Sequence, residues 1–258
     1  MPIHLQTRDA VAQLTLDAPG KQNALSVQMW RDLRAHVAVL SARHDIHLLV
    51  LRGAGGHFAA GADIAEFPRE RFDLDSGKRY HLELIAPALQ AIRNAPQPVL
   101  AAIEGSCVGG GFEISSVCDL RIGARGCRLG APVGKLGFPL ALPELAPLLA
   151  LVGPALASDL LLTGRLLDAD EARAAGLLQR VCDAGQLDAL LEETTAAILT
   201  GSPLAARLNK HNIRMLAAQA GRYTEEQLAA SFAFFASYDY TEGMRAFLEH
   251  RRANFRGG

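Results

Sequence analysis

Two stretches of this sequence decide the fold: Leu48-Leu49-Val50-Leu51-Arg52-Gly53, which continues into Ala54-Gly55-Gly56-His57-Phe58-Ala59-Ala60-Gly61-Ala62-Asp63, and Val99-Leu100-Ala101-Ala102-Ile103-Glu104-Gly105, which continues into Ser106-Cys107-Val108-Gly109-Gly110-Gly111-Phe112-Glu113. Each begins as an apolar run short enough to be a buried strand. Each then opens into glycines, where the backbone can adopt unusual angles and approach a ligand closely. Two such loops side by side could aim two backbone N–H groups at one oxygen atom, which is the geometry of an oxyanion hole.

The length and composition predict a globular protein with a full hydrophobic core. At 258 residues, half of them hydrophobic, the chain can form one large α/β domain or a domain with a small appendage. The formal charge is −1, with 26 Lys and Arg against 27 Asp and Glu. This balance argues against a nucleic-acid or membrane-surface protein. We also expect no apolar stretch of the roughly 18 residues that cross a bilayer, and no signal peptide.

The cysteines indicate the compartment. Cys107, Cys118, Cys127 and Cys182 show no Cys-x-x-Cys spacing. In a chain of this length they are typical of reduced, mostly buried thiols, so we expect a cytoplasmic protein. No cluster of His or Cys supports a zinc site, and no metal is predicted.

Hydrophobic periodicity predicts alternating strands and helices up to about residue 182 and helices alone after it. Ser26, Asp168 and Thr224 are expected to begin helices, the last two through capping boxes with Glu171 and Gln227. The stretches 66–79 and 130–147 receive no assignment. The predicted strands cover 10–16, 46–52, 99–103, 119–123 and 177–181; the predicted helices cover 26–40, 80–94, 110–117, 154–163, 168–176, 184–199, 203–220, 224–237 and 241–254.

Four motifs in order resemble those of the crotonase (enoyl-CoA hydratase/isomerase) superfamily. Phe58-Ala59-Ala60-Gly61-Ala62-Asp63-Ile64 and Gly109-Gly110-Gly111-Phe112-Glu113 are similar to its two signature loops. Asn23-Ala24-Leu25-Ser26 is similar to its N-terminal motif, and Glu242-Gly243-Met244-Arg245-Ala246-Phe247 to its C-terminal one. The resemblance implies an α/β spiral core of ββα repeats over residues 1–195. It also implies a C-terminal helical region over 196–258 that assembles the chain as a trimer or a dimer of trimers.

The resemblance also implies an acyl-CoA thioester as substrate and assigns roles to backbone groups. The amides of Ala62 and Gly110 would donate to the thioester oxygen, where negative charge develops during the reaction. Loss of one such donor typically costs about 2.7–4 kcal/mol. The alternative, two tight turns with close backbone packing, is less favoured because both loops and both flanking strands match. The residues assigned to substrate or CoA binding are Lys21, Ala60, Ala62, Asp63, Ile64, Gly109, Val133 and Phe247.

Three of these binding assignments have competing interpretations. Asp63 and Ile64 would bind adenine through backbone groups, so the Asp63 carboxylate need not touch substrate. Lys21 would lie near the CoA phosphates, although a solvated surface lysine fits nearly as well. Phe247 would approach the adenine from a neighbouring subunit, and a core phenylalanine is equally consistent with its helical spacing.

Glu113 is the best catalytic candidate, because it matches one of the two acid/base glutamates of enoyl-CoA hydratases. Its alternative role is to complement the dipole of the helix that follows Gly110. The second glutamate is absent, since Val133 occupies its place and cannot move a proton. Glu144, eleven residues on, could reach the site on a shifted loop, but a surface or helix-start role is the stronger expectation. Helpers near the first loop could be His57, Asp63, Glu66, Tyr80 and His81.

The sequence therefore predicts an enoyl-CoA hydratase-type lyase with one retained glutamate and no cofactor beyond the CoA thioester that it processes. Another acyl-CoA reaction of the superfamily is the first alternative: an isomerase, a hydrolase or a decarboxylase. A non-catalytic acyl-CoA binder that has lost its second acid is the other. The sequence has no Gly-x-Ser-x-Gly elbow, no intact Gly-x-Gly-x-x-Gly fingerprint and no P-loop, which argues against three other enzyme classes.

Overall fold

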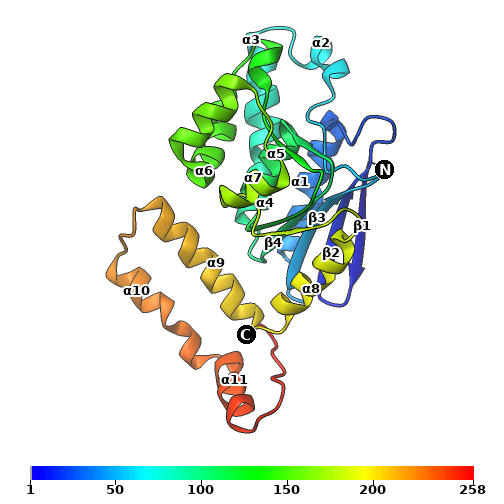
Figure 1. Cartoon of the computed structure of the whole chain (residues 1–258). Coiled ribbons are helices and arrows are strands. Elements are labelled where there is room, and N and C mark those ends of the chain that lie inside the picture. The colour runs from blue at the N-terminus through cyan, green and yellow to red at the C-terminus, as the bar shows by residue number, and fades with distance from the viewer. Residues whose placement is uncertain (1) are drawn as a thin grey trace.

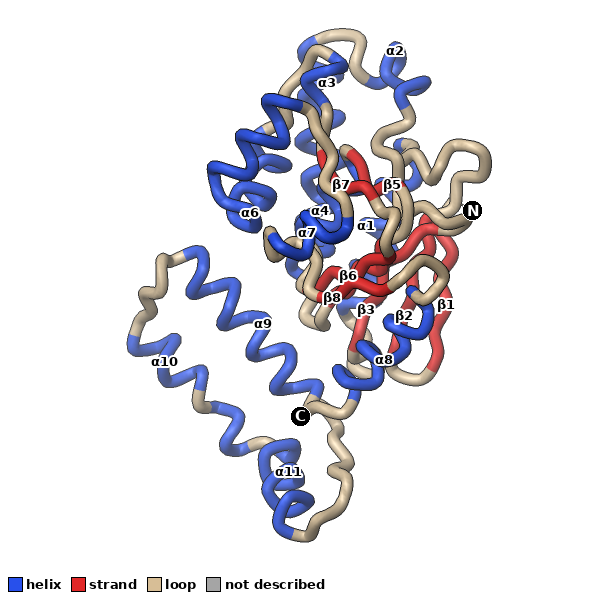
Figure 2. Tube along the Cα trace, in the orientation of Figure 1, coloured by secondary structure: helices blue, strands red, loops and turns tan. Residues whose placement is uncertain are grey.

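The computed structural model describes residues 2–258 and contains a six-stranded sheet at its centre (Figures 1 and 2). Only the first pair, β1 with β2, is antiparallel; each later neighbour is parallel. A separate parallel pair joins a short strand just before the glycines of the second loop to another short strand farther along the chain. The sheet order is β1 (Ile3–Arg8), β2 (Val11–Leu16), β3 (Leu48–Gly53), β4 (Val99–Ile103), β6 (Leu120–Ala124) and β8 (Arg180–Cys182), and the short pair is β5 (Ser106–Val108) with β7 (Arg128–Gly130).

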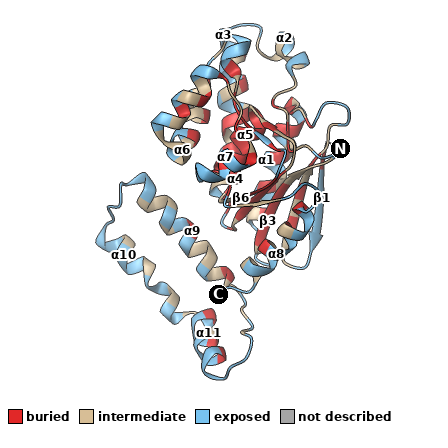
Figure 3. Ribbon diagram, viewed as in Figure 1, coloured by how far each residue is buried: buried red, intermediate tan, exposed pale blue. Residues whose placement is uncertain are grey.

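Strand β3 is buried on both faces, as its continuous apolar sequence predicts. Leu49 and Leu51 join the main core, whereas Leu48 and Val50 join a second cluster on the opposite face. The main core is closed by α1 (Val27–Ser41), α4 (Ala86–Asn94) and α5 (Gly110–Val117), and the second face by α8 (Leu187–Leu199). Figure 3 shows the buried residues gathered where these helices meet the sheet.

The predicted helix starts are confirmed at all three capped positions. The Ser26 side chain accepts from the backbone N–H of Met29 and begins α1. Asp168 begins α7 (Ala169–Ala174) and Thr224 begins α10 (Glu225–Ser231), each in a capping box. Local sequence chemistry is therefore enough to predict where these helices begin, and at α1 the distant Glu66 adds a second contact by accepting from the N–H of Val27.

The charged stretch 66–79 forms α2 (Phe67–Glu70) and α3 (Leu74–Arg79), after a short 3-10 turn at Ile64–Glu66. Between α3 and α4 the helix continues as a π-helical segment, Tyr80–Ile85. Pro87, which lacks the N–H that an α-helical ladder needs, lies two residues beyond the end of this segment. π-helical turns are frequent at functional sites.

Helix α6 (Leu142–Thr163) begins twelve residues before the predicted helix at 154–163. By length and composition alone it could cross a membrane, with a mean hydropathy of 1.9 in its most apolar window. The expectation that no stretch has this character was wrong, because the residues before the predicted helix at 154–163 belong to the same helix. Gly153 interrupts the helix with φ 72° and ψ 169°, so the backbone is not continuously helical.

The structure shifts one further predicted strand and adds elements to two segments that had no assignment. β1 was not predicted, because it lies at the sheet edge and is exposed along most of its length. The strand predicted at 177–181 is β8, shifted to Arg180–Cys182; Leu177 and Leu178 are buried in the preceding loop. Part of 130–147 forms a 3-10 turn at Val133–Leu136 before α6 begins.

The C-terminal region extends away from the sheet as α9 (Pro203–Ala218), α10 and α11 (Tyr238–Leu248), as Figure 1 shows. Two side chains of α9 tie it to the core. Lys210 and Arg214 both bind the Asp119 carboxylate, at 2.7 and 2.5 Å. The predicted boundary at 195/196 falls within α8 and stays a prediction.

Candidate active site

The two glycine loops run side by side in parallel register. Ala59 pairs with Cys107 in a parallel bridge, and the Ala59 carbonyl accepts from the N–H of Val108 at 2.9 Å. Ala62 and Gly110 each lie three residues beyond a member of this pair. The register therefore brings the two predicted donors to the same end of the paired loops.

Both predicted donors have free amides. Within residues 2–258, neither the N–H of Ala62 nor that of Gly110 has a hydrogen-bond acceptor. Their neighbours are satisfied: the N–H groups of Asp63 and Gly109 each donate to a backbone carbonyl at 2.9 Å. Gly110 is the first residue of α5, where a helix leaves its N–H groups without internal partners.

The glycines of the second loop are needed for close packing. A Cβ on Gly111 would lie 2.5 Å from the carbonyl oxygen of Ala59, and one on Gly110 would lie 2.9 Å from the side chain of Leu25. Gly109 has φ 52°, a conformation that side chains rarely adopt. Any larger residue would therefore push the two loops apart.

Asn23 fastens the first loop, a role that its place in the N-terminal motif did not reveal. Its side-chain amide donates to the carbonyls of Ala54 and His57, at 2.8 and 2.7 Å, and its oxygen accepts from the N–H of Ala18. Asn23 is buried and has φ 60°, which asparagine tolerates better than most residues. Its side chain thus provides hydrogen-bond partners for three otherwise unpaired backbone groups.

A cavity of about 230 Å³ opens in front of the two loops. Most of its wall is apolar, with Trp30, Phe67 and Phe138 among the aromatic side chains. Seven of the residues predicted from the sequence line it: Ala60, Ala62, Ile64, Gly109, Gly110, Glu113 and Val133. The structure therefore brings the predicted oxyanion donors and the predicted acid together.

Glu113 lies in the first turn of α5 and is buried within this cavity. Its Oε2 atom has no hydrogen-bond partner in the described chain. Burial raises the pKa of the carboxyl to about 8, helped by the negative charge of Glu144 and opposed by the positive charge of Arg71. Glu113 is therefore mostly protonated at neutral pH and can act as a proton donor.

Glu144 supplies a second carboxylate to the cavity; of the two roles expected for it, the helix start is confirmed and the surface position is wrong. It does lie in the first turn of α6, but its side chain is buried and lines the cavity. Its Oε1 lies 2.6 Å from Nδ1 of His81, and its Oε2 accepts from the N–H of Ala141 at 3.4 Å. The valine at position 133 lines the same cavity, so Glu144 brings to it the functional group that Val133 lacks.

Tyr80 and His81, two of the suggested helpers, both project from the start of the π-helical segment into the cavity. Burial raises the pKa of the Tyr80 hydroxyl, so it stays neutral. The contact of His81 with Glu144 joins the π-helical segment to α6 across the cavity. Sequence spacing could not reveal this pair, because 63 residues separate its members.

The other suggested helpers have structural roles outside the cavity lining. His57 Nδ1 accepts from the N–H of Ser106 at 3.1 Å, and Glu66 accepts from the N–H of Val27 at 2.7 Å. Both contacts hold loops in place. The Asp63 carboxylate likewise caps the turn at Ile64–Glu66 and forms an ion pair with another predicted binding residue, as described next.

Lys21 and Asp63, predicted to bind CoA, lie 2.5 Å apart in an ion pair on the rim of the first loop. Their binding roles stay predictions. Phe247 lies on α11 and is 79% exposed, so the interpretation as a core phenylalanine was wrong. Its predicted contact with adenine across a subunit boundary is untouched by that finding.

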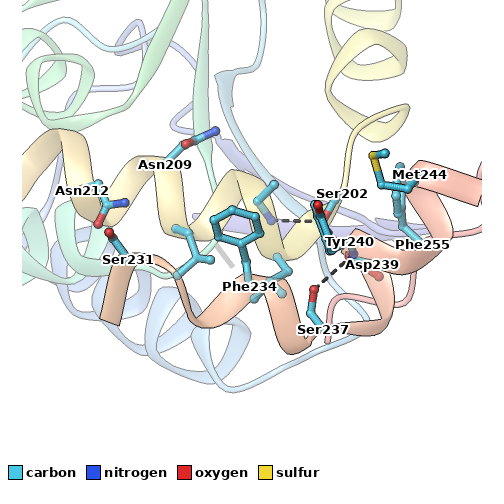
Figure 4. Close-up of a pocket in the computed structure, with 14 residues that line it drawn as sticks. Ser202, Asn209, Asn212, Ser231, Phe234, Ser237, Asp239, Tyr240, Met244 and Phe255 are labelled. Carbon is cyan, nitrogen blue, oxygen red and sulfur yellow. Dashed lines mark hydrogen bonds between the residues drawn. The ribbon is translucent and has the colours of Figure 1, made fainter. Parts of the chain in front are cut away.

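A larger cavity, about 440 Å³, lies between α9 and the helices that follow it. Figure 4 shows Phe234, Asp239 and Tyr240 along this groove. The carboxylate of Asp239 accepts from Ser202 and from the N–H groups of Arg256 and Gly257, so it holds the C-terminal tail. Among the residues that line the groove, the one acid is therefore already bound, unlike Glu113 in the smaller cavity, whose Oε2 has no partner.

Known proteins share both the sequence and the fold. The sequence profile of the enoyl-CoA hydratase/isomerase family matches residues 6–258. The chain belongs to the enoyl-CoA hydratase/isomerase family. It is 34% identical over 260 residues to the crotonyl-CoA hydratase of Syntrophomonas wolfei, covering 98% of this chain and 97% of that protein.

Solved structures of this family match the whole fold. An enoyl-CoA hydratase/carnithine racemase from Magnetospirillum magneticum has a TM-score of 0.97 and 40% identity, covering 100% of this chain and 96% of the other. The enoyl-CoA hydratase of Bacillus anthracis has a TM-score of 0.90 and 28% identity, with both chains covered completely. The crotonase-type fold with its C-terminal helical region is thereby confirmed.

Proposed function

We propose that this enoyl-CoA hydratase/isomerase family member is a hydratase-type lyase that adds water to 2-enoyl-CoA thioesters with two carboxyl groups, Glu113 and Glu144. The observation that carries the proposal is the entry of Glu144 into the cavity that Glu113 and the free amides share. Val133 occupies the place of the second glutamate, and Glu144 supplies the second carboxyl group instead. It also argues against a mere acyl-CoA binder.

The free amides of Ala62 and Gly110 are suited to form the oxyanion hole. As water adds to the β-carbon, negative charge moves to the thioester oxygen. Donors that are already oriented toward that oxygen stabilise the charge without reorganising. Their lack of any other acceptor supports this role.

The two carboxyl groups differ in a way that suits opposite roles. Glu144, fixed by His81 and by the N–H of Ala141, takes a proton from water while the oxygen bonds to the β-carbon. Glu113, protonated at neutral pH, gives its proton to the α-carbon. A carboxyl that stays protonated at neutral pH suits the acid role, and a carboxylate beside it suits the base role. A proton then returns from Glu144 to Glu113, and no cofactor is needed.

The test is hydration of crotonyl-CoA, followed by loss of its conjugated absorbance. The wild type should remove the absorbance, and Glu113→Gln and Glu144→Gln should each slow its loss by about 10²-fold or more. Glu83→Gln is the matched control, because Glu83 lies on the same π-helical segment as His81 but is exposed outside the cavity. Unchanged absorbance with a wild type that binds the thioester would refute the proposal. Release of free thiol or migration of the double bond would identify a hydrolase or an isomerase instead.

We further propose assembly as a trimer or a dimer of trimers in the cytoplasm. The apolar side chains of Phe232, Phe235, Met244 and Phe247, each at least half exposed, support a partner on the C-terminal helices. The four cysteines are free thiols, which supports a reducing compartment. Light scattering of the purified chain should give a multiple of three subunits; a monomer would overturn the assembly.

A further inference from the structure

The acyl cavity contains a guanidinium that the proposed hydration does not use. Arg71 lies just after α2, is half-buried and lines the cavity. Its guanidinium carbon stands 4.5 Å from the ring centroid of Phe67 and 4.3 Å from that of Phe138. Tyr80 completes the set, with its centroid 5.6 Å away. We call these three rings the aromatic cage.

The cage holds the cation but leaves its donors unused. Aromatic rings attract a guanidinium through its flat faces, whereas the five N–H groups point outward in its plane. Within residues 2–258, the Arg71 guanidinium contacts these rings and makes no hydrogen bond or ion pair. By contrast, Arg251 and Arg214 bind carboxylates at their own sites. Arg71 is thus a fixed group of donors that lines the cavity without a hydrogen bond, although the carboxyls of Glu113 and Glu144 line the same cavity.

The position of Arg71 points to the acyl end of the substrate. It acts electrostatically on Glu113, one of the two acids placed around the reacting carbons. It also contacts Tyr80, at the start of the π-helical segment that carries His81. Lys21, the residue predicted near the CoA phosphates, lies instead at the rim of the first loop beside Asp63.

We infer that Arg71 binds a carboxylate at the far end of the acyl chain, so that CoA thioesters of dicarboxylic acids are the preferred ligands of this cavity. The inference rests on the proposed function for the placement of the thioester. A carboxylate matches the planar fork of a guanidinium, and such charge-assisted pairs are stronger than neutral hydrogen bonds. The protonated form of Glu113 keeps that neighbour from repelling the ligand.

The test is calorimetric binding of two saturated thioesters, glutaryl-CoA and its neutral near-isostere 5-methylhexanoyl-CoA, with free CoA as a third ligand. Saturated chains cannot be hydrated, so binding is measured apart from turnover. The wild type should bind glutaryl-CoA more tightly than the isostere. Arg71→Met should weaken the binding of glutaryl-CoA about 10- to 100-fold. It should change the affinities for the isostere and for free CoA by less than about threefold. Arg71→Lys, which keeps the charge without the planar fork, should give an intermediate loss.

Arg69→Met is the matched control, because Arg69 lies two residues away and its side chain is 74% exposed. It should leave all three affinities unchanged. If Arg71→Met weakens the binding of all three ligands equally, Arg71 binds the CoA phosphates and the inference is overturned. Equal wild-type affinity for the two thioesters would overturn it without any variant. If crotonyl-CoA is not hydrated but the Arg71-dependent preference persists, the proposed function fails and this inference stands.

Discussion

Replacing Glu113 with Gln should stabilise the protein at alkaline pH relative to the wild type even as it slows turnover. In the folded protein the pKa of Glu113 is raised from 4.5 to about 8, chiefly by burial. Between those values the unfolded chain releases this proton and the folded chain keeps it. The free energy of unfolding therefore falls with rising pH, by about 1.4 kcal/mol per pH unit from this group. Over the whole window the loss is about 5 kcal/mol.

The Gln variant has no proton to release at this position, so its free energy of unfolding does not fall with rising pH on account of residue 113. Its stability relative to the wild type should rise by roughly 5 kcal/mol from pH 4 to pH 9, most of it between 4.5 and 8. Urea unfolding of both proteins across this range, at one protein concentration, measures the difference. Glu144→Gln serves as the companion variant: with that negative charge gone, the pKa of Glu113 should fall and the gap should narrow. Parallel stability curves for the wild type and Glu113→Gln would refute the reasoning.

Further predictions concern the second acid and the loops. Glu144→Gln should lower kcat about 10²-fold, because it removes the proposed base. His81→Ala should lower kcat less, because Glu144 stays in the cavity and loses only its contact with His81. Stopped-flow absorbance measures both rates, and a larger loss for the histidine variant would contradict these roles. Gly111→Ala should cost about 3 kcal/mol by forcing a methyl group against a carbonyl oxygen 2.5 Å away. Gly77→Ala, in open space within α3, should instead stabilise by about 0.5–1 kcal/mol, and equal effects in urea unfolding would count against the packing argument. Asn23→Ala should cost about 2 kcal/mol, because two half-buried carbonyls lose their donor; thermal unfolding unchanged from the wild type would show that water replaces it.

Local patterns were sufficient to predict the parts of the fold that local chemistry decides. The buried run at 48–51 and the caps at Ser26, Asp168 and Thr224 are examples. The family motifs added the pairing of the two glycine loops, which periodicity alone does not show. Ala62, Gly110 and Glu113 therefore reached the cavity as predicted.

Tertiary packing decided what the sequence could not show. Leu177 and Leu178 have the composition of a strand, but they are buried in a loop, where Leu178 lies over Gly123. The prolines and Gly153 of α6 argue against a continuous helix in the sequence, yet the structure contains one over Leu142–Thr163 with a kink at Gly153. Glu144 depends on that helix for its position, so no local signal could have placed it beside His81.

The most direct test of the account is the infrared spectrum of a thioester labelled with ¹³C at the carbonyl and bound to the protein. Two amides converging on the acyl oxygen would polarise that bond, so the account predicts a carbonyl band at lower frequency in the complex than in water. A bound thioester whose band stays at its frequency in water would show that Ala62 and Gly110 do not share that oxygen.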